Sequence, residues 1–171
     1  PWLSLPRLCL VAAMGTTATS AAYMTAIAAD QIFAREGSIT GSIGVLMQTA
    51  NITGLLEKLG IEPDTIKSGP MKAQPNPLEE TSPQARQVIK DVVMDMYEMF
   101  VEIVAKRRNM DLQQVKALAD GRVYSGLAAK NNGLVDAIGD EDQARDWLTA
   151  ARGVARDLPL RDLKLTDEPL P

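Results

Sequence analysis

The stretch 8–29, LCLVAAMGTTATSAAYMTAIAA, decides the fold of this 171-residue chain. Residues 8–14 are apolar without a break, which predicts a strand buried on both faces. Gly15 interrupts the run, small residues occupy 16–19, and the alanine-rich residues 20–29 predict a helix. The chain is therefore expected to pass from a strand through a tight turn into a helix, with Ser20 at the turn.

Further short strands and helices are expected to alternate along the chain, which predicts an α/β domain with helices on the sheet faces. The predicted strands are 31–36, 43–47, 64–67, 122–124 and 134–138, and the predicted helices are 51–59, a long one from Ser82-Pro83, 111–119, 126–132 and 140–152. The long helix has an apolar stripe at helical spacing, expected to pack in the core, made of Ile89, Val93, Met96, Phe100, Ile103 and Val104. Its basic end, 106–108, is expected to be solvated. Residues 1–157 are interpreted as one domain and 158–171 as a C-terminal tail.

The composition restricts the class of partner. Apolar residues make up 46% of the chain, charged residues make up 23%, and the net charge is -4. Basic residues are scattered, so no nucleic-acid partner is expected. No stretch of the sequence is long and apolar enough to span a bilayer.

The absence of histidine restricts the chemistry. A Ser-His-Asp triad, a Cys-His pair and a His-ligated metal are all excluded within this chain. The single cysteine, Cys9, cannot form an internal disulfide or a multi-Cys metal site. We therefore expect no metal and no cofactor, and a hydrolytic site must take its base from Lys, Asp, Glu or a terminal amine.

Two residues are candidates for nucleophilic chemistry. The hydroxyl of Ser20 projects from a sharp bend, and the N–H groups that follow it can hold a developing oxyanion at the helix N-terminus. A serine at this position is also a common helix N-cap. Lys72 lies in a Pro-rich loop with no acidic residue between Asp64 and Glu79. A free lysine has a pKa of about 10.4, and uncharged surroundings favour its neutral, basic form. The simpler interpretation is a solvated loop lysine.

A third candidate segment is 40–45, TGSIGV. Gly41 and Gly44 permit a positive φ or the close approach of another chain. One interpretation is a turn into a strand. The other is a wall that faces the substrate, in which the Ser42 hydroxyl orients the base.

Taken together, these segments resemble the signal peptide peptidase A family. The run 14–48, MGTTATSAAYMTAIAADQIFAREGSITGSIGVLMQ, resembles the family signature of a serine among small residues, an alanine-rich helix and a TGSIGV segment. Residues 66–77, IKSGPMKAQPNP, resemble the segment that carries the catalytic lysine, and 120–139, DGRVYSGLAAKNNGLVDAIG, resemble its C-terminal element. The resemblance covers roughly residues 12–148.

The resemblance implies the layered α/β fold of Clp-type proteases and crotonases, and a serine endopeptidase with a Ser/Lys dyad. By position, Ser20 matches the nucleophile, Lys72 the general base and Ser42 a serine that hydrogen-bonds the lysine amine. The backbone N–H of Ala21 matches an oxyanion donor. In this family the serine and the lysine meet across neighbouring subunits or tandem domains, so a homo-oligomer with shared active sites is expected.

The family also implies a substrate and a location. Its members degrade the apolar remnants of cleaved signal peptides at the outer face of the bacterial inner membrane. An upstream Ser-Pro-Gly-Gly segment gives the second oxyanion donor, and a membrane anchor precedes it. Residues 1–8, PWLSLPRL, do not match the usual run-in, so the N-terminal part of the family domain is interpreted as missing from this chain. Ala21 and Ala22 stand where glycine often follows the nucleophile. The 171-residue chain alone is therefore expected to be weak or inactive.

Two alternatives remain open. The chain could be a phage-type relative that processes capsid scaffold proteins, or a truncated, non-catalytic oligomeric module. An acyl-CoA enzyme on the related fold has no support besides the fold itself.

Overall fold

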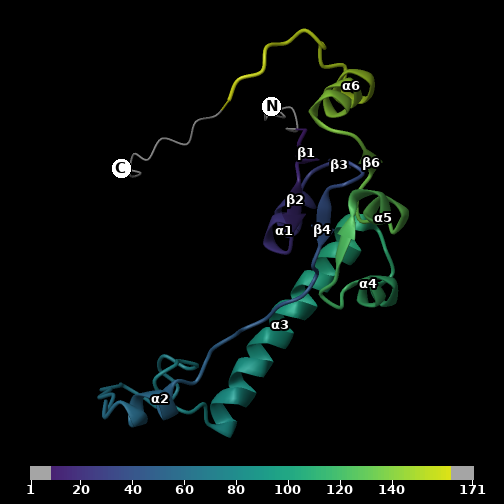
Figure 1. The fold of residues 1–171 in the computed structure, drawn as a ribbon. Helices are drawn as coiled ribbons and strands as arrows, with labels where there is room; N and C mark the ends of the chain where they lie inside the picture. Colours follow the sequence, from purple (N-terminus) through teal and green to yellow (C-terminus); the bar gives the residue numbers. More distant parts are fainter. Residues whose placement is uncertain (1–8, 163–171) are drawn as a thin grey trace, which may run out of the picture.

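The structure is a computed structural model that describes residues 9–162 (Figure 1). Its strands are β1 (Val11–Met14), β2 (Thr17–Thr19), β3 (Gln31–Ala34), β4 (Ile39–Gly41), β5 (Val123–Ser125) and β6 (Ala137–Ile138). Its helices are α1 (Ala21–Ala26), α2 (Thr53–Lys58), α3 (Pro83–Arg108), α4 (Leu112–Leu118), α5 (Gly126–Asn131) and α6 (Glu141–Arg152). Strands and helices are mixed along the chain, so the predicted α/β class is confirmed, and a Clp/crotonase-like layered domain is consistent with it.

The strands form two small sheets that place two serines near each other. One sheet has the order β1-β3-β6 and is parallel throughout. The other has the order β2-β4-β5, with β2 parallel to β4 and β5 antiparallel to it. Thr19 at the end of β2 pairs with Gly41 at the end of β4. Because parallel strands end at the same edge, the next residues, Ser20 and Ser42, leave the sheet side by side.

The hydrophobic core lies between these sheets and the helices α1, α3, α4 and α5. Its largest fully buried side chains include Tyr23 and Ile27 around α1, Ile32 of β3 and Phe100 of α3. Burial of such side chains is the main force that fixes α1 against α3. None of the helices among residues 9–162 combines the length and the apolar character needed to cross a membrane.

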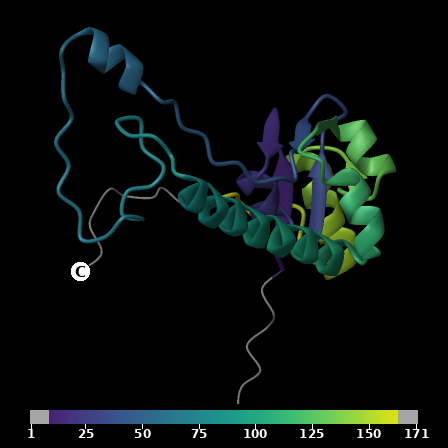
Figure 2. The same ribbon diagram turned by 90° about the horizontal axis from the view of Figure 1, so that it is seen from below.

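An arm, residues 45–82, extends away from this core (Figures 1 and 2). After β4 the chain runs beside α3 to the short helix α2 and then returns to the start of α3. Many large apolar side chains of the arm are exposed, namely Leu46, Met47, Leu55, Leu59, Ile61, Ile66 and Leu78. Ile66, for example, is 96% exposed. The arm therefore leaves much apolar surface uncovered within one copy of the chain.

Helix α3 joins the two regions and changes character along its length. It begins as predicted, with the Ser82 hydroxyl accepting from Ala85 N–H at 3.1 Å and Pro83 in the first turn. Phe100 and Val104 are buried, but Met96 is 47% exposed. The prediction that the whole stripe packs in the core is wrong for the N-terminal half, because that half extends past the sheets beside the arm.

The basic end of α3 is not simply solvated. Arg107 donates to the carbonyls of Ile27 (2.6 Å), Ala28 (2.6 Å) and Ala29 (2.8 Å), at the C-terminal end of α1. Arg108 pairs with Asp136 at 2.6 Å. Arg107 thus satisfies carbonyls beyond the end of α1 that the helix leaves without partners.

Several predicted boundaries were wrong for physical reasons. Residues 43–47 and 64–67 are not strands: the first leaves the sheet after Ser42, and the second lies in the arm, where no described strand is available to pair. Small residues at 16–19 include β2, which was not expected. Strand β1 is not buried on both faces, because it is an edge strand and Ala13 is exposed.

The helix starts were predicted better. Asp111 and Gln114 form the expected capping box of α4, and the Ser125 hydroxyl caps α5 by accepting from Ala128 N–H. Strand β6 is shorter than the predicted 134–138. Residues 158–162 of the predicted tail form no helix or strand, and the rest of that tail lies outside the described residues.

Candidate active site

Ser20 stands in a strained turn between β2 and α1. Its backbone has φ 53° and ψ -119°, a conformation that a residue with a Cβ rarely adopts. The turn is fixed because the Ser20 N–H donates to the Gly41 carbonyl (2.8 Å) and the Ser20 carbonyl accepts from Met24 N–H (2.9 Å). Hydrogen bonds to the sheet on one side and to the helix on the other therefore maintain the strained conformation of Ser20.

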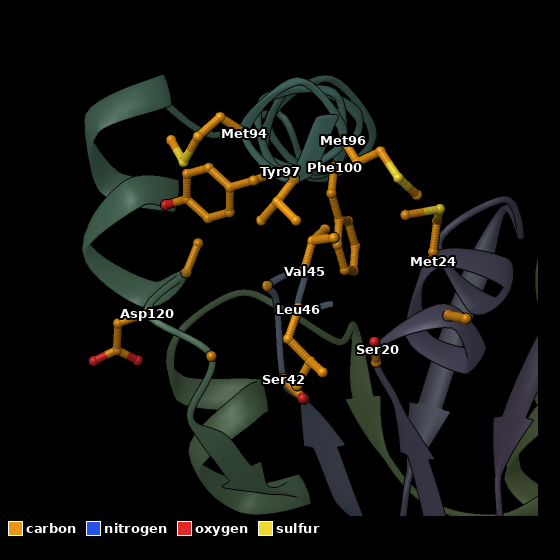
Figure 3. Close-up of a pocket in the computed structure, with 15 residues that line it drawn as sticks. Ser20, Met24, Ser42, Val45, Leu46, Met94, Met96, Tyr97, Phe100 and Asp120 are labelled. Atoms are coloured by element: carbon orange, nitrogen blue, oxygen red, sulfur yellow. The ribbon is translucent and has the colours of Figure 1, made fainter. Parts of the chain in front are cut away.

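The Ser20 hydroxyl is not used as a helix cap. It makes no capping hydrogen bond to α1, in contrast to the hydroxyls of Ser82 and Ser125, which both do. Ser20 thus occupies the N-cap position of α1, as expected for a serine there, but its hydroxyl does not act as the cap. Figure 3 shows the hydroxyl pointing into a pocket.

Helix α1, which begins next to Ser20, is firmly anchored. Tyr23 is fully buried, and its hydroxyl donates to the Leu134 carbonyl at 2.8 Å. Burial raises the pKa of Tyr23 well above its ordinary value, so the hydroxyl stays a donor. Arg107 holds the other end of the helix. Ser20 is thus attached directly to a helix that is fixed at both ends.

Ser42, like Ser20, has a positive backbone φ angle. Its φ is 51°, and its N–H donates to the Arg122 carbonyl at 2.8 Å. Ser20 and Ser42 are two of four non-glycine residues with positive φ in the part of the chain that the structure describes. The other two are Asn109, which ends α3, and Ala73, which follows Lys72. Strain of this kind gathers at functional sites.

The two glycines of the 40–45 segment have different surroundings. A Cβ on Gly41 would lie 2.6 Å from Tyr124 Cδ2, and Gly41 is buried beneath the site rather than lining the pocket. Gly44 lines the pocket, and a Cβ there would approach the Gly121 Cα at 3.3 Å. Both glycines permit close approach of the 121–124 segment.

The pocket has a volume of about 760 Å³ and is largely apolar (Figure 3). Ser20 and Ser42 lie on one side, and Met96, Tyr97 and Phe100 of α3 face them. The remaining lining residues are Ala21, Met24, Gly44, Val45, Leu46, Val93, Met94, Ala119, Asp120 and Gly121. This volume is typical of a pocket that encloses a ligand of several side chains.

Among residues 9–162, the lining of the pocket supplies no effective base. Asp120 and Tyr97 are its titratable lining residues. The Arg122 guanidinium donates to the Asp120 carboxylate and lowers the pKa of Asp120 to about 2. In Figure 3 this carboxylate points away from the serines. A carboxylate of such low pKa is a poor acceptor for a hydroxyl proton.

Lys72 lies in the arm and not in this pocket. It is exposed, in a turn where its N–H donates to the Gly69 carbonyl at 3.1 Å. The loop between α2 and α3, which contains Lys72, lies at the end of α3 remote from the sheets (Figures 1 and 2). One copy of the chain therefore brings Ser20, Ala21, Ser42 and Gly44 together and leaves Lys72 apart.

Helix α3 contributes side chains to this site that were not predicted from the sequence. Met96 and Phe100 were interpreted as packing residues, but both line the pocket. Met94, Tyr97 and Asp120 were not singled out at all. A detectable signal existed for Asp120, which opens the DGRVYSG segment. Among residues 9–162 no group of Cys, Asp and Glu side chains is placed to hold a metal ion.

A serine in a strained strand-to-helix turn that faces a ligand-sized pocket is an arrangement typical of serine hydrolases. Comparison with known proteins gives the family. The chain belongs to peptidase family S49, whose family model matches residues 8–155.

Named relatives agree with this assignment. The chain is 48% identical, over 136 residues, to an Enterococcus faecium protein provisionally named signal peptide peptidase SppA, covering 80% of this chain and 40% of that protein. It is 38% identical to a provisionally named protease, slr0021, of Synechocystis, covering 86% of this chain and 53% of that protein. It is 32% identical to Protease 4 of Salmonella typhi, covering 79% of this chain and 22% of that protein. The chain thus spans about half of the Synechocystis relative and less of the other two.

Proposed function

We propose that this chain is the catalytic part of a serine endopeptidase in which Ser20 is the nucleophile and Lys72 of a second copy is the general base. The observation that carries the proposal is the Ser20 turn, with its positive φ and its hydroxyl free of any capping bond. Family S49 membership supports peptide hydrolysis as the reaction.

The mechanism is acyl transfer. A neutral Lys72 amine accepts the Ser20 hydroxyl proton as the oxygen attacks a peptide carbonyl. The backbone N–H of Ala21 stabilises the oxyanion of the tetrahedral intermediate. The lysine then returns the proton to the leaving amine, and water hydrolyses the acyl-enzyme. Ser42, at the edge of the pocket, accepts a hydrogen bond from the lysine amine and orients it.

A second copy is required because one chain separates its own Ser20 from its Lys72. Exposed apolar side chains of the arm, such as Leu46 (80%) and Leu59 (63%), support packing of the arm on another copy. The N-terminal half of α3 adds the exposed apolar side chains of Val88, Val92 and Met94. Self-association through these residues buries apolar area and brings the base to the nucleophile in one step.

The pocket also favours an apolar substrate. Met24, Val45, Met96 and Phe100 surround the space next to Ser20 with carbon and sulfur atoms. Remnants of cleaved signal peptides have matching side chains, and the Enterococcus faecium relative bears the name of such a peptidase. We place the assembled enzyme at the outer face of the bacterial inner membrane, held there by an upstream anchor.

The test is hydrolysis of an apolar signal-peptide substrate by the complete gene product. Ser20→Ala and Lys72→Ala should each reduce kcat by at least about 10⁴-fold, as removal of a catalytic nucleophile or base does. Both variants should remain folded oligomers in sedimentation. Substantial cleavage by either variant would show that the residues are assigned wrongly. A folded parent protein that does not cleave this peptide but cleaves a capsid scaffold protein would identify the phage-type function. A folded parent protein that cleaves neither substrate would identify a non-catalytic module.

A further inference from the structure

A polar cluster lies beside the turn that carries Lys72. Glu79 accepts hydrogen bonds from the ammonium of Lys67 and from the side-chain amide of Asn76. The same Asn76 amide donates to the carbonyl of Ala73 at 3.0 Å. The Glu79 carboxylate is therefore tied, through Asn76, to the residue that follows Lys72.

The carboxylate in this cluster is a negative charge. Its hydrogen bond from Lys67 and, next, that from Asn76 lower the pKa of Glu79, so Glu79 is ionised at neutral pH. The Lys67 side chain is only 14% exposed, whereas Lys72 is exposed. The two lysines of this short loop thus have different surroundings: one is paired with the carboxylate and largely buried, and the other is solvated.

A nearby carboxylate would impair a lysine that must act as a base. An opposite charge within a few ångströms favours the protonated ammonium, which cannot accept the serine proton. The charged residues of the stretch 60–82, besides Lys72 itself, are Glu62, Asp64, Lys67, Glu79 and Glu80. From α3, Arg86 lines the same small hollow as Pro75. Among these, Glu79 is the carboxylate that hydrogen bonds attach to the Lys72 turn.

We propose that Lys67 and Asn76 sequester the Glu79 carboxylate, so that Lys72 has no acidic partner in its own loop. This inference rests on the proposed role of Lys72 as the general base. It makes Lys67 a positioning residue that acts through Glu79, and it explains why a loop that carries a base can also carry an acid.

The test is the pH dependence of kcat/KM on the apolar peptide, measured with the complete gene product. In Lys67→Met the Glu79 carboxylate loses its paired cation and keeps only the Asn76 amide. Its uncompensated negative charge then favours protonation of Lys72, so the acidic limb of the profile should move up by about one pH unit. The rate at pH 7 should fall about tenfold, while the rate on the alkaline plateau stays close to the parental value.

Two further variants give the inference its specificity. Lys67→Met combined with Glu79→Gln should return the acidic limb to the parental position, because no carboxylate is left to be released. Glu79→Gln alone leaves the Lys67 cation unpaired, and a like charge disfavours protonation of Lys72. Its acidic limb should therefore move to lower pH, which keeps the test available even if Lys67→Met does not fold.

The controls are Lys67→Arg and Glu80→Gln. Arginine retains the cation and should keep the profile near the parental one, and the neighbouring exposed Glu80 should have no effect. An unchanged Lys67→Met profile would overturn the inference. The inference would also be overturned if Lys67→Met lowered kcat/KM equally at every pH and added Glu79→Gln did not restore it. That result would indicate a structural role for Lys67. Activity that survives in Lys72→Ala would instead refute the proposed function itself.

Discussion

The core and the arm of this chain differ in how firmly they hold their candidate catalytic residues. The core fixes its catalytic candidate completely: Ser20 is held by a sheet hydrogen bond on one side and by the anchored helix α1 on the other. The arm carries Lys72 in an exposed turn and presents apolar side chains to solvent. One chain therefore builds the surroundings of Ser20 within its core, whereas the arm leaves apolar side chains uncovered. In the function that we propose, folding preorganises the nucleophile and assembly of two copies delivers the base.

The two halves of helix α3 show the same difference, because one half is buried in the core and the other is exposed. Its C-terminal half packs in the core through Phe100, Val101 and Val104. Its N-terminal half exposes Val88, Val92 and Met94 beside the arm. The helix is therefore a rigid link between the serine site and the surface that we assign to a second copy.

The largest expected contrast between the two regions is a pair of glycine substitutions. A Cβ on Gly126 in the core would lie 1.9 Å from the backbone carbonyl oxygen of Arg35, which accepts a hydrogen bond from Ser38 N–H in the turn after β3. A Cβ on Gly54 in the arm would meet nothing within 4 Å. Gly126→Ala should lower the free energy of unfolding by about 3 kcal/mol or more. Gly54→Ala should leave it within about 1 kcal/mol, in the stabilising direction.

Urea unfolding followed by circular dichroism measures both changes. Equal effects of the two substitutions would remove the distinction between a close-packed core and an open arm. Gly126→Ala without any loss of stability would show that α5 and β3 are not packed as described.

A smaller contrast compares two valines on α3. Val104 is fully buried, whereas Val92 is 42% exposed. Val104→Ala should cost about 2 kcal/mol of unfolding free energy, through lost burial and a cavity. Val92→Ala should change the stability of the isolated chain by no more than about 0.5 kcal/mol. It should, however, weaken self-association, which sedimentation velocity over a range of concentrations detects.

The valine pair also separates two explanations of the exposed surface. If Val92→Ala leaves association unchanged and Leu46→Ala and Leu59→Ala do so as well, the apolar surface has another occupant. Weaker association with unchanged monomer stability places the second copy on this face.

The sequence predicted the parts of the fold that depend on local chemistry. The starts of α3 and α4 were predicted because the side chains of Ser82 and Asp111 bond nearby backbone N–H groups. The failures concern long-range pairing. Residues 43–47 have the composition of a strand, but the positive φ at Ser42 turns them away from the sheet.

For the site as well, the local features could be predicted from the sequence and the long-range contacts could not. The motif around Ser20 gave its place at the turn, since the strand and helix that build it are adjacent in sequence. The α3 wall of the pocket could not be predicted, because Phe100 reaches the site only through tertiary packing across 80 residues of sequence from Ser20. The exposed half of α3 was interpreted as core, because a helical stripe predicts burial without saying whether the same chain supplies the covering surface.

The most direct test of a divided active site is complementation between two inactive variants of the complete gene product. Ser20→Ala and Lys72→Ala are denatured together, refolded as a mixture and assayed on the apolar peptide. If serine and lysine meet across copies, the mixture should recover about one quarter of the parental rate, as random neighbouring predicts. Each variant refolded alone should stay inactive. A mixture as inactive as its components, with mixed oligomers verified by differently tagged chains, would contradict the account and place both residues of each site within one chain.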